Sequence, residues 1–127
     1  MAGNLSNYLE NKLLDHFLGT TSYTMPTPVY VGLYTVAPSD STAGTEVSGG
    51  SYARQTATFS AASGGATSND ANIDFTNMPS ATVVAIGISD AITGGNLLVW
   101  GTLTANKSLD AGDTLRIATG DLDISID

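Results

Sequence analysis

The 127-residue chain contains no cysteine, one histidine and only four basic residues against twelve acidic ones. Without cysteine, neither disulfide bonds nor a thiolate metal site can stabilise the fold, so stability has to come from packing, an oligomer or a partner. The formal net charge of −8 repels polyphosphate and argues against nucleic acid and anionic membranes as partners. We therefore expect any partner to be neutral or basic.

The scarcity of histidine and cysteine also argues against most enzyme classes. Ser-His-Asp, Cys-His and zinc arrangements would all depend on His16, which we expect to pack or to lie in an interface instead. The glycine pairs at 49–50, 64–65 and 94–95 lack the following Lys and Ser or Thr of a phosphate-binding loop, so we expect turns there. We predict no enzymatic activity, no cofactor, no metal and no small-molecule substrate.

Long apolar runs are missing as well. No run approaches the ~20 residues that a membrane-spanning helix needs, and the N-terminal residues lack the basic region of a signal peptide. We therefore expect no membrane partner and synthesis in the cytoplasm.

Apolar residues spaced three and four apart predict one helix, over residues 5–18. The predicted stripe consists of Leu5, Tyr8, Leu9, Lys12, Leu13, His16 and Phe17. Asn4 or Ser6 can cap its start, and Gly19 can end it in the left-handed conformation. Such a helix packs onto a sheet or against a copy of itself. We expect its stripe to supply interface residues, namely Leu5, Tyr8, Leu9, Leu13 and Phe17.

Most of the remaining chain alternates between apolar and polar residues and is interrupted by glycine-rich turns. Strands are predicted at 29–36, 52–59, 72–75, 83–89, 96–104 and 114–118, with a last one at the C-terminus. The segments 83–89 and 96–104 read as a hairpin. We predict a mainly β fold, an antiparallel β-sandwich of seven to eight strands, Ig-like or jelly-roll-like, with one N-terminal helix. Residues 1–127 are expected to form a single domain.

Residues 39–51 form a long loop of small residues in this prediction. Long loops within compact domains are usually functional or disordered, so this loop is a candidate contact region. We expect Glu46, Val47 and Tyr52 to contribute to an interface.

Arg54 lies in the predicted strand 52–59 and allows two interpretations. Its guanidinium can pair loosely with surface carboxylates. Alternatively, Asp74 or Asp90 holds it bidentately, which would fix strand register or clamp the loop 39–51. We favour a structural clamp, because Tyr52 on the same strand face suggests that this face is partly covered.

The polar face of the C-terminal strand and Trp100 are two further candidates for a functional role. The C-terminal strand places four polar residues on one face: Asp121, Asp123, Ser125 and Asp127. This row could bind Ca²⁺, but we favour a solvated outer face, because Ca²⁺ sites usually gather their ligands from a tight loop. Trp100 lies in an apolar strand and is expected in the core.

Five segments together resemble a widespread family of small tailed-bacteriophage virion proteins. They read "LSNYLENKLLDHFLG", "PTPVYVGLYTVAPSD", "GTEVSGGSYARQTATF", "GGNLLVWGTLT" and "DAGDTLRIATGDLDISID". Members are often labelled tail fibre proteins, and others are similar to capsid decoration, or cement, proteins. The resemblance implies a structural component of the virion without enzymatic activity.

Among the positions that this resemblance allows, we expect capsid decoration. The protein would be a homotrimer on the outer surface of the capsid, bound to the major capsid protein and made in the host cytoplasm. The alternative is a tail fibre, baseplate or neck component, although a receptor-binding fibre would be expected to have a longer chain with a fibrous region. A carbohydrate-binding β-sandwich acting at the host surface is a third possibility.

Overall fold

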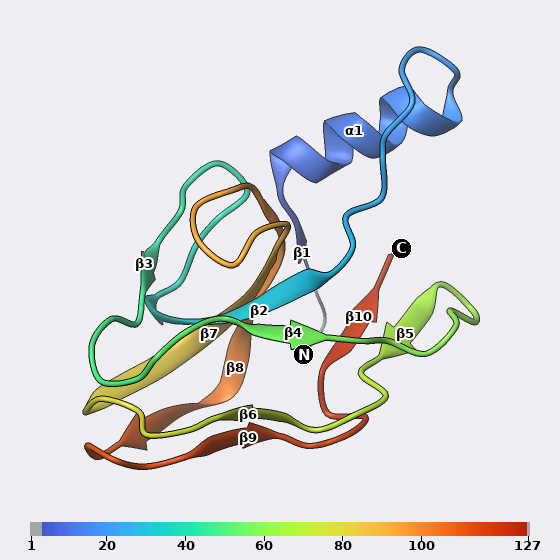
Figure 1. The fold of residues 1–127 in the computed structure, drawn as a ribbon. Helices are drawn as coiled ribbons and strands as arrows, with labels where there is room; N and C mark the ends of the chain where they lie inside the picture. Colours follow the sequence, from blue (N-terminus) through green and yellow to red (C-terminus); the bar gives the residue numbers. More distant parts are fainter. Residues whose placement is uncertain (1–3, 127) are drawn as a thin grey trace.

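The computed structural model describes residues 4–126, which form antiparallel strands and one N-terminal helix (Figure 1). In chain order the elements are β1 (Asn4–Leu5), α1 (Asn7–Phe17), β2 (Val29–Val36), β3 (Thr45–Glu46), β4 (Gln55–Ala57), β5 (Ala66–Ser68), β6 (Ile73–Phe75), β7 (Ala81–Ser89), β8 (Leu97–Leu109), β9 (Leu115–Ile117) and β10 (Asp123–Ser125). The predicted mainly β, sandwich-like antiparallel fold is confirmed. Residues 4–126 contain ten strands rather than seven or eight, because several are only two or three residues long.

The main sheet has the strand order β1-β8-β7-β2-β3, and β4 pairs with the first part of β2. Its centre is the predicted hairpin, present as β7 and β8 joined by residues 90–96. Along the remaining edge of β2, β4 and β3 follow one another, so two short strands share one long neighbour. Between them lies a short stretch of β2 around Leu33 that pairs with neither strand.

The pairs β6–β9 and β5–β10 cover one face of this sheet (Figure 1). Val31 and Leu33 of β2 are completely buried on that face, as the alternation predicts. Phe75 of β6 and Leu122, just before β10, are buried in the same apolar cluster. The core is therefore the space between the main sheet and the two strand pairs.

The long strand β8 leaves the sheet locally. Ala85 pairs with Thr102, while Val83 pairs with Lys107. The paired positions are therefore two residues apart on β7 but five residues apart on β8. The extra residues form a bulge, and such irregularities bend a strand away from its partner. As a result, one side of the core is opened at residues 103–107.

The helix α1 begins later than predicted, because Leu5 belongs to β1 and pairs with Val99 of β8. Ser6 caps it: the hydroxyl accepts a hydrogen bond from the amide of Leu9 and donates one to the carbonyl of Leu97 at 2.5 Å. Leu9 is the one residue of α1 that is buried. Within residues 4–126 there is no helix with the length and hydropathy that crossing a bilayer requires.

Three local expectations were wrong. The regular strand near Arg54 is limited to β4, because Tyr52 turns away from the ladder. The loop 39–51 is not made of small surface residues throughout, because Val47 is buried in the core cluster. Trp100 is only half-buried, because its neighbour Val99 takes the core side of β8, and its indole donates a hydrogen bond to Asp40 Oδ1 at 2.9 Å.

Asn69 is a polar residue inside the core, with 2% of its surface exposed. Its amide group donates to the carbonyls of Ala71 at 2.8 Å and Ala118 at 3.0 Å, and its carbonyl oxygen accepts from the amide of Leu122 at 2.9 Å. Because buried polar groups need partners, this one side chain fixes how the segments around β6, β9 and β10 meet.

We predict that Asn69→Leu lowers the free energy of unfolding by about 3 kcal/mol, because a side chain of similar size removes three hydrogen bonds and leaves the buried amide of Leu122 without a partner. Urea denaturation of the purified protein measures this change. Asn72→Ala is the matched control: Asn72 accepts from Thr119 at the surface, where water can replace it. Equal losses in the two variants would contradict the structural role of Asn69.

Candidate functional site

Three side chains that are close in sequence meet on the outer face of β2, opposite the core. They are Glu46 of β3, Tyr52 and Arg54, and we refer to them as the Arg54 cluster. Arg54 binds Glu46 with two parallel hydrogen bonds, Nε to Oε2 at 3.0 Å and Nη2 to Oε1 at 2.9 Å. The Arg54 side chain is only 11% exposed. This is the fork geometry that arginine forms with a carboxylate and lysine cannot.

The third nitrogen of the guanidinium reaches another part of the chain. Nη1 of Arg54 donates to the carbonyls of Ala91 at 2.7 Å and Gly94 at 2.9 Å, both in the connection between β7 and β8. Arg54, directly before β4, thus links this part of the chain to the loop 39–51, through Glu46, and to the loop 90–96. Its contacts have the form of the predicted clamp, and a stabilising role stays a prediction.

The carboxylate that holds Arg54 is neither of the two predicted ones. Asp74 instead accepts two hydrogen bonds from Arg116, its cross-strand neighbour on β9, at 2.7 and 3.0 Å. Asp90 accepts from the backbone and side-chain nitrogens of Asn96 at 2.7 and 3.0 Å. Burial alone would raise the pKa of Asp90, but these hydrogen bonds outweigh it and keep that pKa below its usual value.

Tyr52 fills the gap that β3 and β4 leave along the edge of β2. Its hydroxyl donates to Glu46 Oε2 at 2.5 Å and accepts from the amide of Leu33 at 2.9 Å, while its ring stacks on Phe75 with centroids 6.1 Å apart. Burial, and next the hydrogen bond to Glu46, raise the pKa of Tyr52. The hydroxyl therefore stays protonated and acts as a donor.

The Arg54 cluster lies flat on the sheet because glycine occupies the position beneath it. A Cβ atom at Gly32 would lie 2.8 Å from Glu46 Oε2, and one at Gly87 would lie 2.7 Å from a ring carbon of Tyr34. The two glycines face each other across β2 and β7. Sequence reasoning missed this role, although a glycine inside a strand pattern often marks a close approach.

The Arg54 cluster separates two shallow hollows in the surface. One, of about 250 Å³, is lined by Tyr34, Gly44 and Leu97 among others, and the second, of about 400 Å³, by Val47, Gly49 and Ile92. The carboxylate between them is neutralised by Arg54, and the tyrosine is protonated. Such a cluster is suited to holding loops in place rather than to moving protons.

The residues predicted for an interface lie in different environments. Leu9 and Val47 are buried, while Leu5, Tyr8 and Leu13 are partly buried against the core. Glu46 and Tyr52 belong to the Arg54 cluster. Phe17 is 67% exposed and is the one member of the set whose side chain is largely free to meet another molecule. A role in an interface stays a prediction for all of them.

The two candidate ligand groups are at the surface. Asp121 and Asp123 are exposed, and Asp127 lies outside the described residues. No group of three or more His, Asp or Glu side chains that could hold a metal is present among residues 4–126. His16 accepts a hydrogen bond from the amide of Tyr23 at 3.1 Å and thereby ties down the segment after α1.

We predict that Arg54→Ala lowers the free energy of unfolding by about 2 kcal/mol, because it removes four charge-assisted hydrogen bonds and leaves Glu46 without its counter-charge. Arg54→Lys should restore only a part, since lysine lacks the fork. Arg116→Ala is the control, because that ion pair is exposed and should contribute little. An Arg54→Ala protein as stable as the natural one would exclude a clamp.

We also predict that Gly32→Ala destabilises the protein by about 1–2 kcal/mol, because the new methyl group displaces Glu46. In a Glu46→Ala background the same substitution should cost much less. A double-mutant cycle by urea denaturation measures this coupling. Additive effects would show that Gly32 and Glu46 do not constrain each other.

Comparison with known proteins identifies the family. No curated protein matches the chain. The model of one protein family, described as podophage GP4 fiber I protein gp80, matches residues 4–125. The matched region contains α1, the Arg54 cluster and all ten strands of the described part. Because the match covers nearly the whole sequence, the chain belongs to the family of the podophage GP4 fiber I protein gp80, a family of phage virion proteins.

Proposed function

We propose that the protein is a non-enzymatic structural subunit of a fibre on a tailed phage. The observation that carries this proposal is the family match over residues 4–125, whose description names a fibre protein. It favours the tail over the capsid surface that we expected from the sequence. The function is then to build and to present a surface, and no reaction is required of the chain.

The Arg54 cluster supports a structural role. It joins the loops 39–51 and 90–96 on one face of the main sheet by hydrogen bonds from a single guanidinium. Loops that are fixed before binding lose less conformational entropy when they meet a partner. We propose that these two loops form the contact surface toward a neighbouring virion protein.

Capsid decoration is the second candidate. The described residues share one apolar cluster, and small β-domains of this kind suit repetition over a symmetric shell. In that case the partner would be the major capsid protein, and the protein would be a homotrimer on the capsid's outer surface.

Copy number separates the two positions. Quantitative mass spectrometry of purified virions gives the ratio of this protein to the major capsid protein, with a tail protein of known copy number as internal standard. We expect a small number of copies per virion, as for a fibre.

A ratio near one, or a simple fraction that matches capsid symmetry, would overturn the fibre proposal in favour of decoration. Gold-labelled antibody against the protein provides an independent readout of position. Labels at the tail support a fibre, whereas labels distributed over the head contradict it.

A further inference from the structure

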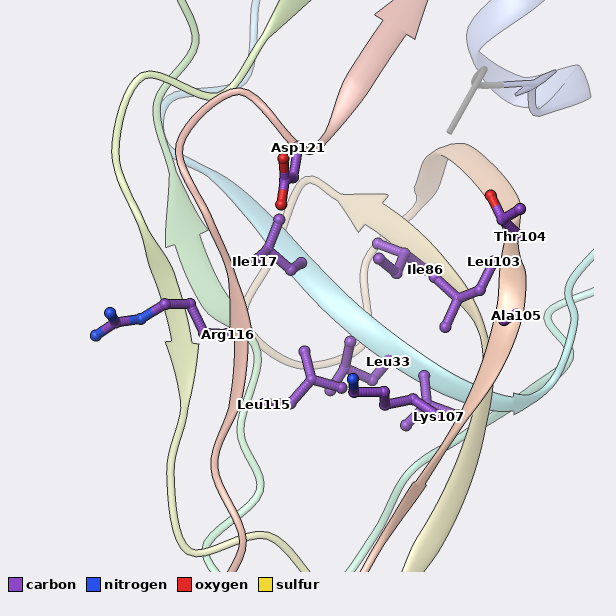
Figure 2. A pocket seen from close by; sticks show the side chains of 11 residues that line it. Leu33, Ile86, Leu103, Thr104, Ala105, Lys107, Leu115, Arg116, Ile117 and Asp121 are labelled. Carbon is purple, nitrogen blue, oxygen red and sulfur yellow. The ribbon is translucent and has the colours of Figure 1, made fainter.

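The bulge in β8 opens a pocket into the core, with a volume of about 270 Å³ (Figure 2). Its floor is made of buried apolar side chains from three strands, β2, β7 and β9, namely Leu33, Val83, Ile86, Leu115 and Ile117. On the open side, Leu103 to Ala105 of β8 form its wall. An apolar side chain of a partner that entered this pocket would leave water for apolar surroundings, which is favourable.

Three charged residues line this pocket, Lys107, Arg116 and Asp121. Figure 2 shows Lys107 extending from β8 toward Leu115, while Arg116 points away from the pocket. Arg116 is neutralised by Asp74. Lys107 has no ion pair within residues 4–126. The pocket therefore combines an apolar floor with the ammonium group of Lys107 and, elsewhere in its lining, the carboxylate of Asp121.

The exposed side of α1 is complementary to this pocket, because it carries apolar side chains and an acidic residue. Leu14 is 48% exposed, Phe17 67% and Leu18 69%, and they lie on one stripe because they are three and four residues apart. Glu10, one turn before Leu14, is exposed on the same stripe. Leu14, Phe17 and Leu18 are outside the apolar cluster of the core, and the carboxylate of Glu10 is opposite in charge to Lys107.

We propose that α1 of one copy docks its exposed stripe into this pocket of a second copy, with Glu10 beside Lys107. The contact has to join two copies, because Figure 1 shows α1 and the β9 side of the pocket at opposite ends of the molecule. A volume of 270 Å³ lies below the usual range of small-molecule sites and suits one or two inserted side chains.

The partner surfaces are different patches of the same chain, so the contact is heterologous. Repeating it generates a closed ring if the rotation between copies closes, and an open filament if it does not. Each subunit would then bury its exposed helix stripe in one neighbour and have its own pocket filled by another. The inference is independent of whether the assembly lies on the tail or on the capsid.

Engineered cysteines test the contact without background, because the chain has none of its own. Leu14→Cys and Ala105→Cys, both at exposed positions, are prepared as separate full-length proteins of different mass, mixed and oxidised. We expect the mixed disulfide to exceed both homodimers severalfold. Ala62→Cys, exposed and outside both surfaces, replaces Ala105→Cys in the control and should give only random cross-links.

Every other pattern overturns the proposal. Predominant Leu14→Cys homodimers would mean that helices pair with each other, predominant Ala105→Cys homodimers that pockets face each other, and random cross-links that neither surface is used. Charge exchange provides a second readout by sedimentation equilibrium. Lys107→Glu should weaken self-association about tenfold, and adding Glu10→Lys in the same chain should restore it. Failure of this rescue would contradict the proposed pairing.

Discussion

The ion pair between Arg54 and Glu46 is the interaction on which the outer face of the sheet depends. The guanidinium uses two nitrogens for the carboxylate and a third for two loop carbonyls, so one side chain fixes three segments. The carboxylate in turn orients the hydroxyl of Tyr52, which completes the edge of β2 at Leu33. Glycine at position 32 is the consequence, because any Cβ atom there would displace the carboxylate.

Strand alternation, glycine-rich turns and helical spacing were sufficient to predict the mainly β fold, the central hairpin and the single helix. The partner of Arg54 could not be predicted, because β3 has only two residues and no alternation that reveals its pairing with β2. The bulge in β8 was missed for a similar reason. Its exposed polar residues read as the end of a strand, although the backbone returns to pair with Val83.

The helix shows what the spacing of apolar residues can and cannot predict. Spacing identifies which residues share a stripe, but it cannot tell whether the stripe faces its own sheet or another molecule. In the structure β1 anchors only the start of α1, so Leu9 reaches the core and Phe17 does not. Trp100 illustrates the same limit within a strand, since one step along the chain decides between the core and the surface.

The negative net charge of the chain opposes the assembly of identical copies. A net charge of −8 makes copies repel each other, but salt screens charges beyond about 8 Å at physiological ionic strength. Association then depends on short-range terms, apolar filling and local ion pairs. Of the four basic residues, Arg54 and Arg116 are paired within the protomer and Lys12 lies over the ring of Tyr8. Lys107 is therefore the basic residue best placed to meet an acidic group of a neighbouring copy.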